Sequence, residues 1–272
     1  MSPQQLSYIS NCIKSFNTEK DWGIASAQAA GHLPDESPDI PETWDLREPW
    51  WEIRDQGETG ACVGFAVADS VLRWHFVKSN RLQQTEYLSA RYLWMASKET
   101  DEFTDRPTTF IERYGTSIKA ALAIAYKYGV MLEKDLQFES ATLFQDDETV
   151  FYAIAATRRI CSYFNLDRNV NNWRRWIYNK GPIVTRLDPD QSWLNLLPLI
   201  SDLTETERKS GKLDSYCEDI GLGGHACALV GYTRDRFIVR NSWGTDWGDN
   251  GFAYASDSYA QEAFNEAYGV VL

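Results

Sequence analysis

The stretch Arg54-Asp-Gln-Gly-Glu-Thr-Gly-Ala-Cys62-Val-Gly-Phe65 places a cysteine directly after a glycine-rich turn and at the start of an apolar pattern. Between Cys62 and Lys78 the apolar residues recur at helical spacing, and no glycine or proline follows Gly64. This pattern predicts a buried helix whose first turn carries Cys62. Unpaired N–H groups at the start of a helix stabilise a thiolate, so this position favours a lowered pKa for the thiol.

A distant pair of segments supplies a histidine and an asparagine. Gly223-Gly-His225-Ala-Cys-Ala-Leu-Val-Gly-Tyr232 leads into Phe237-Ile-Val-Arg-Asn241-Ser-Trp-Gly-Thr-Asp-Trp-Gly-Asp-Asn-Gly-Phe252. A cysteine before a helix, or a histidine beside a strand, is by itself more often structural. The run of tryptophans and glycines after Asn241 is not typical of an ordinary core, however, and the combination indicates catalysis.

The chemical hypothesis assigns one role to each polar residue. Cys62 is the nucleophile, His225 is its acid–base partner, and Asn241 orients the imidazole. The side-chain amide of Gln56 and the N–H of Cys62 are the expected donors to the oxyanion. Gly60 permits a tight turn and leaves room for the main chain of a substrate.

Length, charge and cysteine content limit the other classes of function. A chain of 272 residues is long enough for one or two cores, and its net charge of -12 argues against nucleic acid or an acidic membrane as partners. No apolar run reaches the roughly 18 residues that span a bilayer. His225 and Cys227 are too few for a zinc site, and no metal or organic cofactor is implied.

The setting of the chain is expected to be cytoplasmic. Its first residues have neither a basic head nor an apolar core of a signal peptide. The five cysteines have no paired spacing, which favours free thiols in a reducing compartment. Of the remaining histidines, His32 is interpreted as a solvated side chain and His75 as a packed or surface residue rather than a catalyst.

A helical first half and a strand-rich second half predict an α+β fold with two lobes and a cleft between them. Further helices are expected over 87–95, 117–128, 150–160 and 170–178, and strands over 182–187, 226–232, 236–240 and 251–254. Residues 203–212 are expected to form a solvated helix or loop.

Residues 1–40 stand apart from the rest. Leu6, Ile9, Ile13 and Phe16 recur at helical spacing, so a short amphipathic helix is predicted, followed by a proline-rich acidic loop from Gly31. This arm is expected to act as a packed strap or a partial plug of the cleft.

From about Ile40 to its end the chain resembles the papain-like cysteine peptidases, and most of all their bacterial-type branch. The segments Asp45-Leu-Arg47, Tyr87-Leu-Ser-Ala-Arg-Tyr-Leu, Gly115-Thr-Ser-Ile-Lys-Ala-Ala-Leu and Tyr128-Gly-Val-Met-Leu-Glu133 carry the resemblance beside the Cys62, His225 and Asn241 motifs. It implies one peptidase domain over 41–272, with a helical lobe at about 41–135 and a β-rich lobe at about 136–272.

The resemblance also assigns the residues around the nucleophile. It implies that Trp243 shields the Asn241–His225 contact and that Trp247 walls the leaving-group side. Gly115 or Thr116 is expected to pair with the substrate main chain, and Gly224 to form an open floor beside His225.

Two positions depart from the family pattern. Thr59 stands where secreted members carry a disulfide cysteine, and Val63 replaces the aromatic residue that usually follows the nucleophile. The first departure agrees with a reducing compartment. The second changes the packing behind the thiol.

The expected function is hydrolysis of peptide bonds in a peptide or protein substrate through an acyl-enzyme. Two alternatives stay open at this point: a specialised processing enzyme or transferase, for instance one that removes a leader peptide, and a catalytically silent binding protein on the same scaffold. Substrate preference, endo- against exopeptidase action and oligomeric state are not encoded in these motifs.

Overall fold

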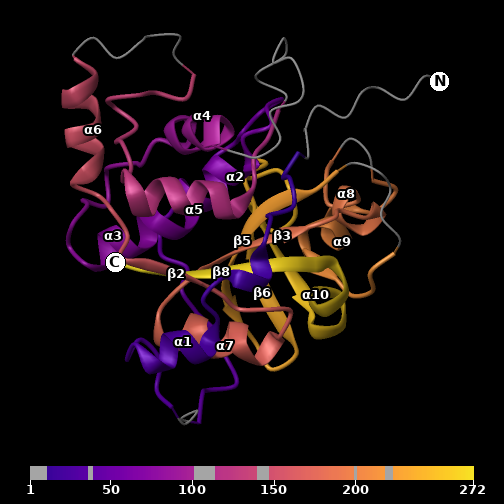
Figure 1. Cartoon of the computed structure of the whole chain (residues 1–272). Coiled ribbons are helices and arrows are strands. Elements are labelled where there is room, and N and C mark those ends of the chain that lie inside the picture. The colour runs from indigo at the N-terminus through magenta and orange to yellow at the C-terminus, as the bar shows by residue number, and fades with distance from the viewer. Residues whose placement is uncertain (1–10, 36–38, 101–113, 140–146, 199–200, 218–222) are drawn as a thin grey trace.

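The helix that begins at Cys62 lies at the centre of one of two lobes (Figure 1). The computed structural model describes residues 11–35, 39–100, 114–139, 147–198, 201–217 and 223–272. One helical run consists of α2 (Cys62–Gly64), η2 (Phe65–Leu72) and α3 (Arg73–Lys78), and it is buried from residue 62 to residue 77. Helices α4 (Ala90–Thr100) and α5 (Ile118–Lys127) pack against it, and α6 (Glu148–Ala156) follows.

The second lobe is built on a mixed sheet. Its described strands run in the order β2-β8-β3-β5-β6-β7-β4, with β1 added to β5, and all pairs are antiparallel except β4 with β7. The strands are β1 (Trp44–Asp45), β2 (Ser162–Asn165), β3 (Ile183–Leu187), β4 (Lys212–Leu213), β5 (His225–Tyr232), β6 (Arg236–Arg240), β7 (Phe252–Ser256) and β8 (Phe264–Val271). Four helices accompany them: α7 (Val170–Asn179), α8 (Gln191–Leu194), α9 (Glu205–Lys209) and α10 (Asp257–Ala263).

Strand β5 joins the two lobes because its alternate side chains belong to different cores. Ala226, Ala228 and Val230 pack in the same apolar cluster as the central helix. Cys227 and Leu229 point the other way, into the cluster of the β-rich lobe. His225 is the first residue of this strand, so it lies where the two cores meet.

The predicted α+β fold is confirmed, and most helix predictions hold with small shifts. Helix α5 begins after Ser117, whose side chain accepts from the Ala120 N–H as an N-cap. Helix α4 begins three residues later than expected, because Leu88 pairs with Leu132 as a β-bridge and the Ser89 N–H donates to Met131. Strand β8 was not predicted, since its polar residues and a glycine interrupt any alternation, but β2 and β3 pair with it on both sides.

The helix predicted over residues 6–16 is wrong for its described part. Residues 11–16 are not helical, because the N–H groups of Cys12 and Ile13 donate to the carbonyls of Gly224 and Thr116 in the body of the protein. Residues 1–10 lie outside the described part. The arm then forms two short helices that were not predicted, η1 (Thr18–Lys20) and α1 (Ile24–Ala29), before the irregular stretch from Gly31 that was expected.

Candidate active site

Cys62 lies at the first turn of the central helix, as its sequence context predicted. Its side chain is 0% exposed, and its sulfur accepts hydrogen bonds from the backbone N–H groups of Ala226, Asn11 and Val63. These donors favour a thiolate, but burial outweighs them and raises the pKa of Cys62. The lowered pKa expected from the helix terminus is therefore not found in this closed arrangement, because water is excluded from the thiol.

His225 and Asn241 form the predicted pair. Nε2 of His225 lies 2.7 Å from Oδ1 of Asn241, and the same oxygen accepts the backbone N–H of Ser242 at 2.8 Å. An oxygen that accepts from Nε2 places the ring proton there and leaves Nδ1 to exchange a proton with a thiol. Burial lowers the pKa of His225 to about 4, so the imidazole is neutral here.

Two tryptophans pack against the His225 ring, and a third packs on them. The ring centroid of Trp243 lies 4.8 Å from that of His225, which agrees with its expected shielding role. Trp193 lies 5.7 Å from the same ring, and Trp247 packs on Trp193 at 4.7 Å. All three are at most 1% exposed. Trp193 was missed because a single tryptophan in a short helix carries no pattern, and contact of Trp247 with a leaving group stays a prediction.

Gln56 is held in place from both ends of its amide. Its Nε2 donates to the Thr59 carbonyl at 2.8 Å, and its Oε1 accepts the Ser242 hydroxyl at 2.7 Å. The backbone N–H of Gln56 donates to the Ser242 carbonyl at 2.9 Å. The turn that contains Gly60 is thereby tied to the residue after Asn241. The oxyanion role of Gln56 stays a prediction, and so does the contact of Gly60 with a substrate.

The N-terminal arm lies across this site. The indigo segment of Figure 1 runs between the helical lobe and the sheet. The Cys12 N–H donates to the Gly224 carbonyl at 2.6 Å, and the Ile13 N–H donates to the Thr116 carbonyl at 3.1 Å. The Asn11 carbonyl packs so closely on Gly115 that no Cβ would fit there. Gly115 and Thr116, of which one was expected to pair with a substrate main chain, and Gly224, which was expected to form an open floor, therefore all contact the arm.

Behind the nucleophile, a buried ion pair links the lobes. Nη2 of Arg240 lies 2.8 Å from Oδ2 of Asp69, and both side chains are at most 3% exposed. Arg54 and Arg73 each have one guanidinium nitrogen 3.9 Å from the other oxygen of Asp69. Sequence reasoning missed this cluster, because a charged residue inside an apolar helical stretch gives no sign of its partner.

Cys227, a second buried thiol, lies on β5 and has different surroundings from Cys62. Cys227 points into the core of the β-rich lobe, with its sulfur 3.4 Å from the Thr185 hydroxyl, and burial raises its pKa to about 12. It begins no helix. Cys62 therefore stays the predicted nucleophile.

The described residues contain no group of three or more histidine, cysteine, aspartate or glutamate side chains arranged to hold a metal ion. Among these same residues, no helix combines the length and the apolar character needed to cross a bilayer.

Comparisons with known proteins agree with this geometry. A family profile described as "Papain family cysteine protease" matches residues 40–268. A cysteine proteinase of Theileria parva is 26% identical over 258 residues, which cover 90% of this chain and 47% of the relative. A viral cathepsin of Epiphyas postvittana nucleopolyhedrovirus is 27% identical over 207 residues, 74% of this chain and 54% of the relative. The chain spans about half the length of these curated relatives.

Solved structures share the fold. Xylellain, a cysteine protease from Xylella fastidiosa, superimposes with a TM-score of 0.75 at 17% identity, covering 98% of both chains. The digestive procathepsin L2 of Tenebrio molitor larval midgut gives a TM-score of 0.70 at 19% identity, covering 100% of this chain and 81% of the other.

Proposed function

This chain belongs to the papain family of cysteine proteases, and we propose that it hydrolyses peptide bonds with Cys62 as nucleophile and His225, Asn241 and Gln56 as its partners. One observation carries the proposal. The buried 2.7 Å contact between His225 and Asn241 orients an imidazole beside a strand whose next residue, Ala226, donates its N–H to the sulfur of Cys62. Thr59, which stands where secreted members carry a disulfide cysteine, supports assignment to the bacterial-type branch of the family.

The chemistry follows from these positions. His225 Nδ1 takes the proton of Cys62, and the thiolate attacks the carbonyl carbon of a peptide bond. The oxyanion is stabilised by Gln56 Nε2 and the Cys62 N–H. His225 then protonates the leaving amine as the C–N bond breaks, and water hydrolyses the thioester with the same histidine as base.

The reactive form requires a more open cleft than this structure has. Burial keeps both Cys62 and His225 neutral, since it raises the pKa of the thiol and lowers that of the imidazole. Water entering the cleft reverses both effects and favours the thiolate–imidazolium pair. The closed structure is thus proposed to be a latent form, in which the arm covers the catalytic pair.

Labelling and hydrolysis together test the proposal. The full chain and a variant lacking residues 1–17 are treated with an epoxysuccinyl or iodoacetamide probe from pH 5 to 9, with peptide mapping and a Cys62→Ala control. Denatured casein is digested in parallel and the products are identified by mass spectrometry. Rapid labelling of Cys62 and new peptide termini, both lost in Cys62→Ala, support the proposal.

Two outcomes contradict it. If Cys62 of the shortened variant reacts no faster than Cys161, which is exposed, the thiol is not activated. If Cys62 reacts rapidly but no peptide bond is cut, the site performs another reaction, and ligated products in the presence of added amines identify a transferase.

A further inference from the structure

Two charged side chains on neighbouring strands hold the arm by its main chain. Nε of Arg186, on β3, donates to the Cys12 carbonyl at 3.0 Å, and Oε1 of Glu266, on β8, accepts the Ser15 N–H at 2.8 Å. The two residues are direct cross-strand partners, so their side chains lie on one face of the sheet. Arg186 therefore donates a hydrogen bond to the main chain of this short segment, and Glu266 accepts one from it.

The guanidinium of Arg186 is fixed by hydrogen bonds to neighbouring side chains. Its Nη1 donates to Asn265 and its Nη2 to Asp188, each at 2.8 Å, and Asn265 donates to the other oxygen of Asp188 at 2.8 Å. The side chain is 5% exposed, which leaves Nε as the edge that faces the arm. A planar guanidinium fixed on two sides offers its remaining donor in one direction only.

Glu266 is a half-buried carboxylate, and its two oxygens have different surroundings. Oε1 is occupied by Ser15, whereas Oε2 is buried and has no hydrogen-bond partner among the described residues. Burial raises the pKa of Glu266, while Ser15, Arg186 and Lys14 act in the opposite direction. Removing the Ser15 N–H would take a hydrogen-bond donor from a carboxylate whose other oxygen is buried, so this contact matters to the closed form.

The orientation of the arm keeps its own peptide bonds away from the chemistry. The Cys12 carbonyl is directed to Arg186, and the arm presents the Asn11 N–H to the Cys62 sulfur. Nucleophilic attack requires a carbonyl carbon at the thiol and its oxygen at the oxyanion donors. Gln56 Nε2 instead donates to Thr59.

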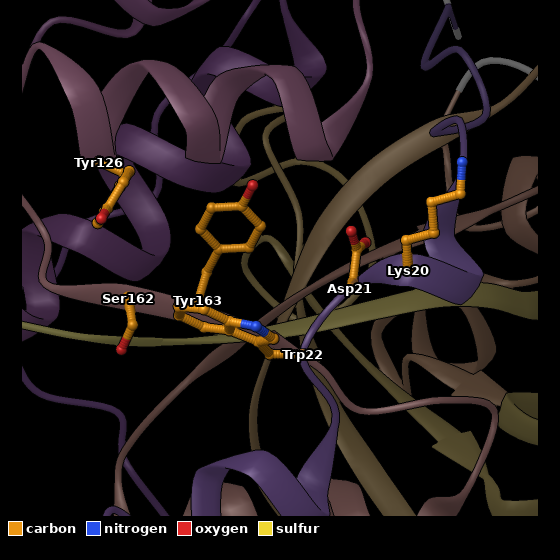
Figure 2. Close-up of a pocket in the computed structure, with 6 residues that line it drawn as sticks. All are labelled: Lys20, Asp21, Trp22, Tyr126, Ser162 and Tyr163. Carbon is orange, nitrogen blue, oxygen red and sulfur yellow. The ribbon is translucent and has the colours of Figure 1, made fainter. Parts of the chain in front are cut away.

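The following part of the arm is built into the β-rich lobe. Ala27 and Leu33 are buried in its core, the Tyr268 hydroxyl donates to Asp21, and the Asn165 N–H donates to Trp22. Figure 2 shows Asp21 and Trp22 beside Tyr163, around a small open pocket that Lys20, Tyr126 and Ser162 also line. This segment is part of the folded lobe and is not a loose tail.

A joint separates the two parts. Asn17 has a positive φ of 50°, and Lys119 Nζ donates to the carbonyls of Phe16 and Asn17 at 2.9 and 3.1 Å. The plug (residues 11–16) lies before this joint, and the strap (residues 18–34) lies after it.

We propose that Arg186 and Glu266 form a main-chain latch that holds the plug across Cys62 in an uncleavable orientation, and that the strap stays docked when the latch opens. The ligand of this latch is the peptide main chain of residues 12–15 of the same molecule. Because the strap keeps the plug at a high effective concentration, opening is reversible and gates access to Cys62 without removal of the arm. The inference rests on the proposed latency, but its readout is thiol accessibility.

A matched pair of arm variants tests the latch in the full chain. Ser15→Pro deletes the N–H that Glu266 accepts, whereas Ser15→Ala keeps that N–H and removes the hydroxyl, which contacts both the Lys119 N–H and the Glu266 carboxylate. We expect iodoacetamide to label Cys62 at least about tenfold faster in Ser15→Pro than in the wild type, since the rate follows the open fraction. Ser15→Ala is expected to stay within about twofold of the wild type, as the same open fraction sets its rate.

A second pair tests the other half of the latch. Arg186→Met removes the donor to Cys12, and Arg175→Met is its control, because Arg175 holds the Pro34 carbonyl in the strap at 3.1 Å. Faster labelling in Arg186→Met alone supports the latch. Equal labelling rates in Ser15→Pro and Ser15→Ala overturn it, whether or not Arg186→Met folds.

Hydrogen exchange tests the joint. In Ser15→Pro, amides of residues 11–16 are expected to exchange at least about tenfold faster than in the wild type, with those of residues 24–34 unchanged. Equal acceleration of both segments shows that plug and strap leave together and overturns the two-part arm. These readouts do not depend on peptide hydrolysis, so a failure of the proposed activity remains distinguishable from a failure of the latch.

Discussion

Arg240 and Asp69 form a buried ion pair across the two lobes, with Nη2 of Arg240 2.8 Å from Oδ2 of Asp69. Asp69 belongs to the helix that starts at Cys62, and Arg240 directly precedes Asn241. Arg240 also donates to the carbonyls of Trp51 and Glu52 and to the Ser70 hydroxyl. The distance between nucleophile and orienting residue is therefore set by a charge contact as well as by apolar packing.

Breaking this pair should destabilise the fold strongly. Asp69→Asn leaves the Arg240 guanidinium buried without its counter-charge, and we expect the free energy of unfolding to fall by about 3–5 kcal/mol. Urea denaturation measures it. The control is Lys78→Met, which removes an exposed pair with Glu48 and should change stability by less than about 1 kcal/mol. Equal effects of the two substitutions would contradict the structural role of Asp69.

Gln56 is predicted to act in the transition state. On the Ser15→Pro background, Gln56→Ala should lower kcat by about 10²- to 10³-fold with little change in KM, because an oxyanion donor acts on charge that develops during the reaction. Ser242→Ala, which frees only the Gln56 Oε1 contact, should have a smaller effect. Steady-state kinetics on a cleavable peptide measure both. A loss confined to KM in Gln56→Ala would refute the oxyanion assignment.

His75 should make the protein sensitive to mild acid. It packs edge-on against Trp74 in α3, and burial lowers its pKa to about 4, below the ordinary 6.5. A lowered folded-state pKa means that the unfolded chain takes up the proton first, so stability is lost as pH falls from about 6.5 towards 4. The shift corresponds to a loss on the order of 3 kcal/mol.

The matched variant is His75→Gln, which cannot titrate. The difference in unfolding free energy between wild type and His75→Gln should shift in favour of the variant between pH 7 and pH 4. His225 is retained in both proteins, so its own titration cancels from the difference. Denaturant midpoints that fall in parallel over this range would contradict the neutral, buried state of His75.

Trp193 should contribute strongly to the stability of the fold, although its sequence context gave no sign of this. Trp193→Ala removes a side chain packed against His225, Trp243 and Trp247, and we expect a loss of about 3–5 kcal/mol. Trp22→Ala is the control, since Trp22 is 61% exposed and the stability of this variant should stay within about 1 kcal/mol of the wild type.

The substitution Trp193→Phe should admit water to the His225 ring and thereby raise the pKa of His225, which NMR titration detects. An unchanged pKa would show that Trp193 does not exclude water.

Local patterns were sufficient for the elements that carry the catalytic residues. The apolar period after Cys62 predicted the central helix, and the local patterns over 117–128 and 226–232 predicted α5 and β5. The pattern failed for Ile13 and Phe16, whose helical spacing lies in an extended segment. There, hydrogen bonds to Gly224 and Thr116 outweigh a weak helical preference.

The motifs around Cys62, His225 and Asn241 were legible in the chain because they depend on neighbours within a few residues: a glycine turn, a helix start and a strand end. The protonation state of Cys62 and His225 could not be predicted from the sequence, since their desolvation depends on every residue that packs over them, including Asn11 from the far end of the chain. The same holds for the Asp69–Arg240 pair and for Arg186 and Glu266, which meet through contacts between residues distant in sequence. Folding alone brings such residues together, and these contacts decide whether the thiol is covered or free to react.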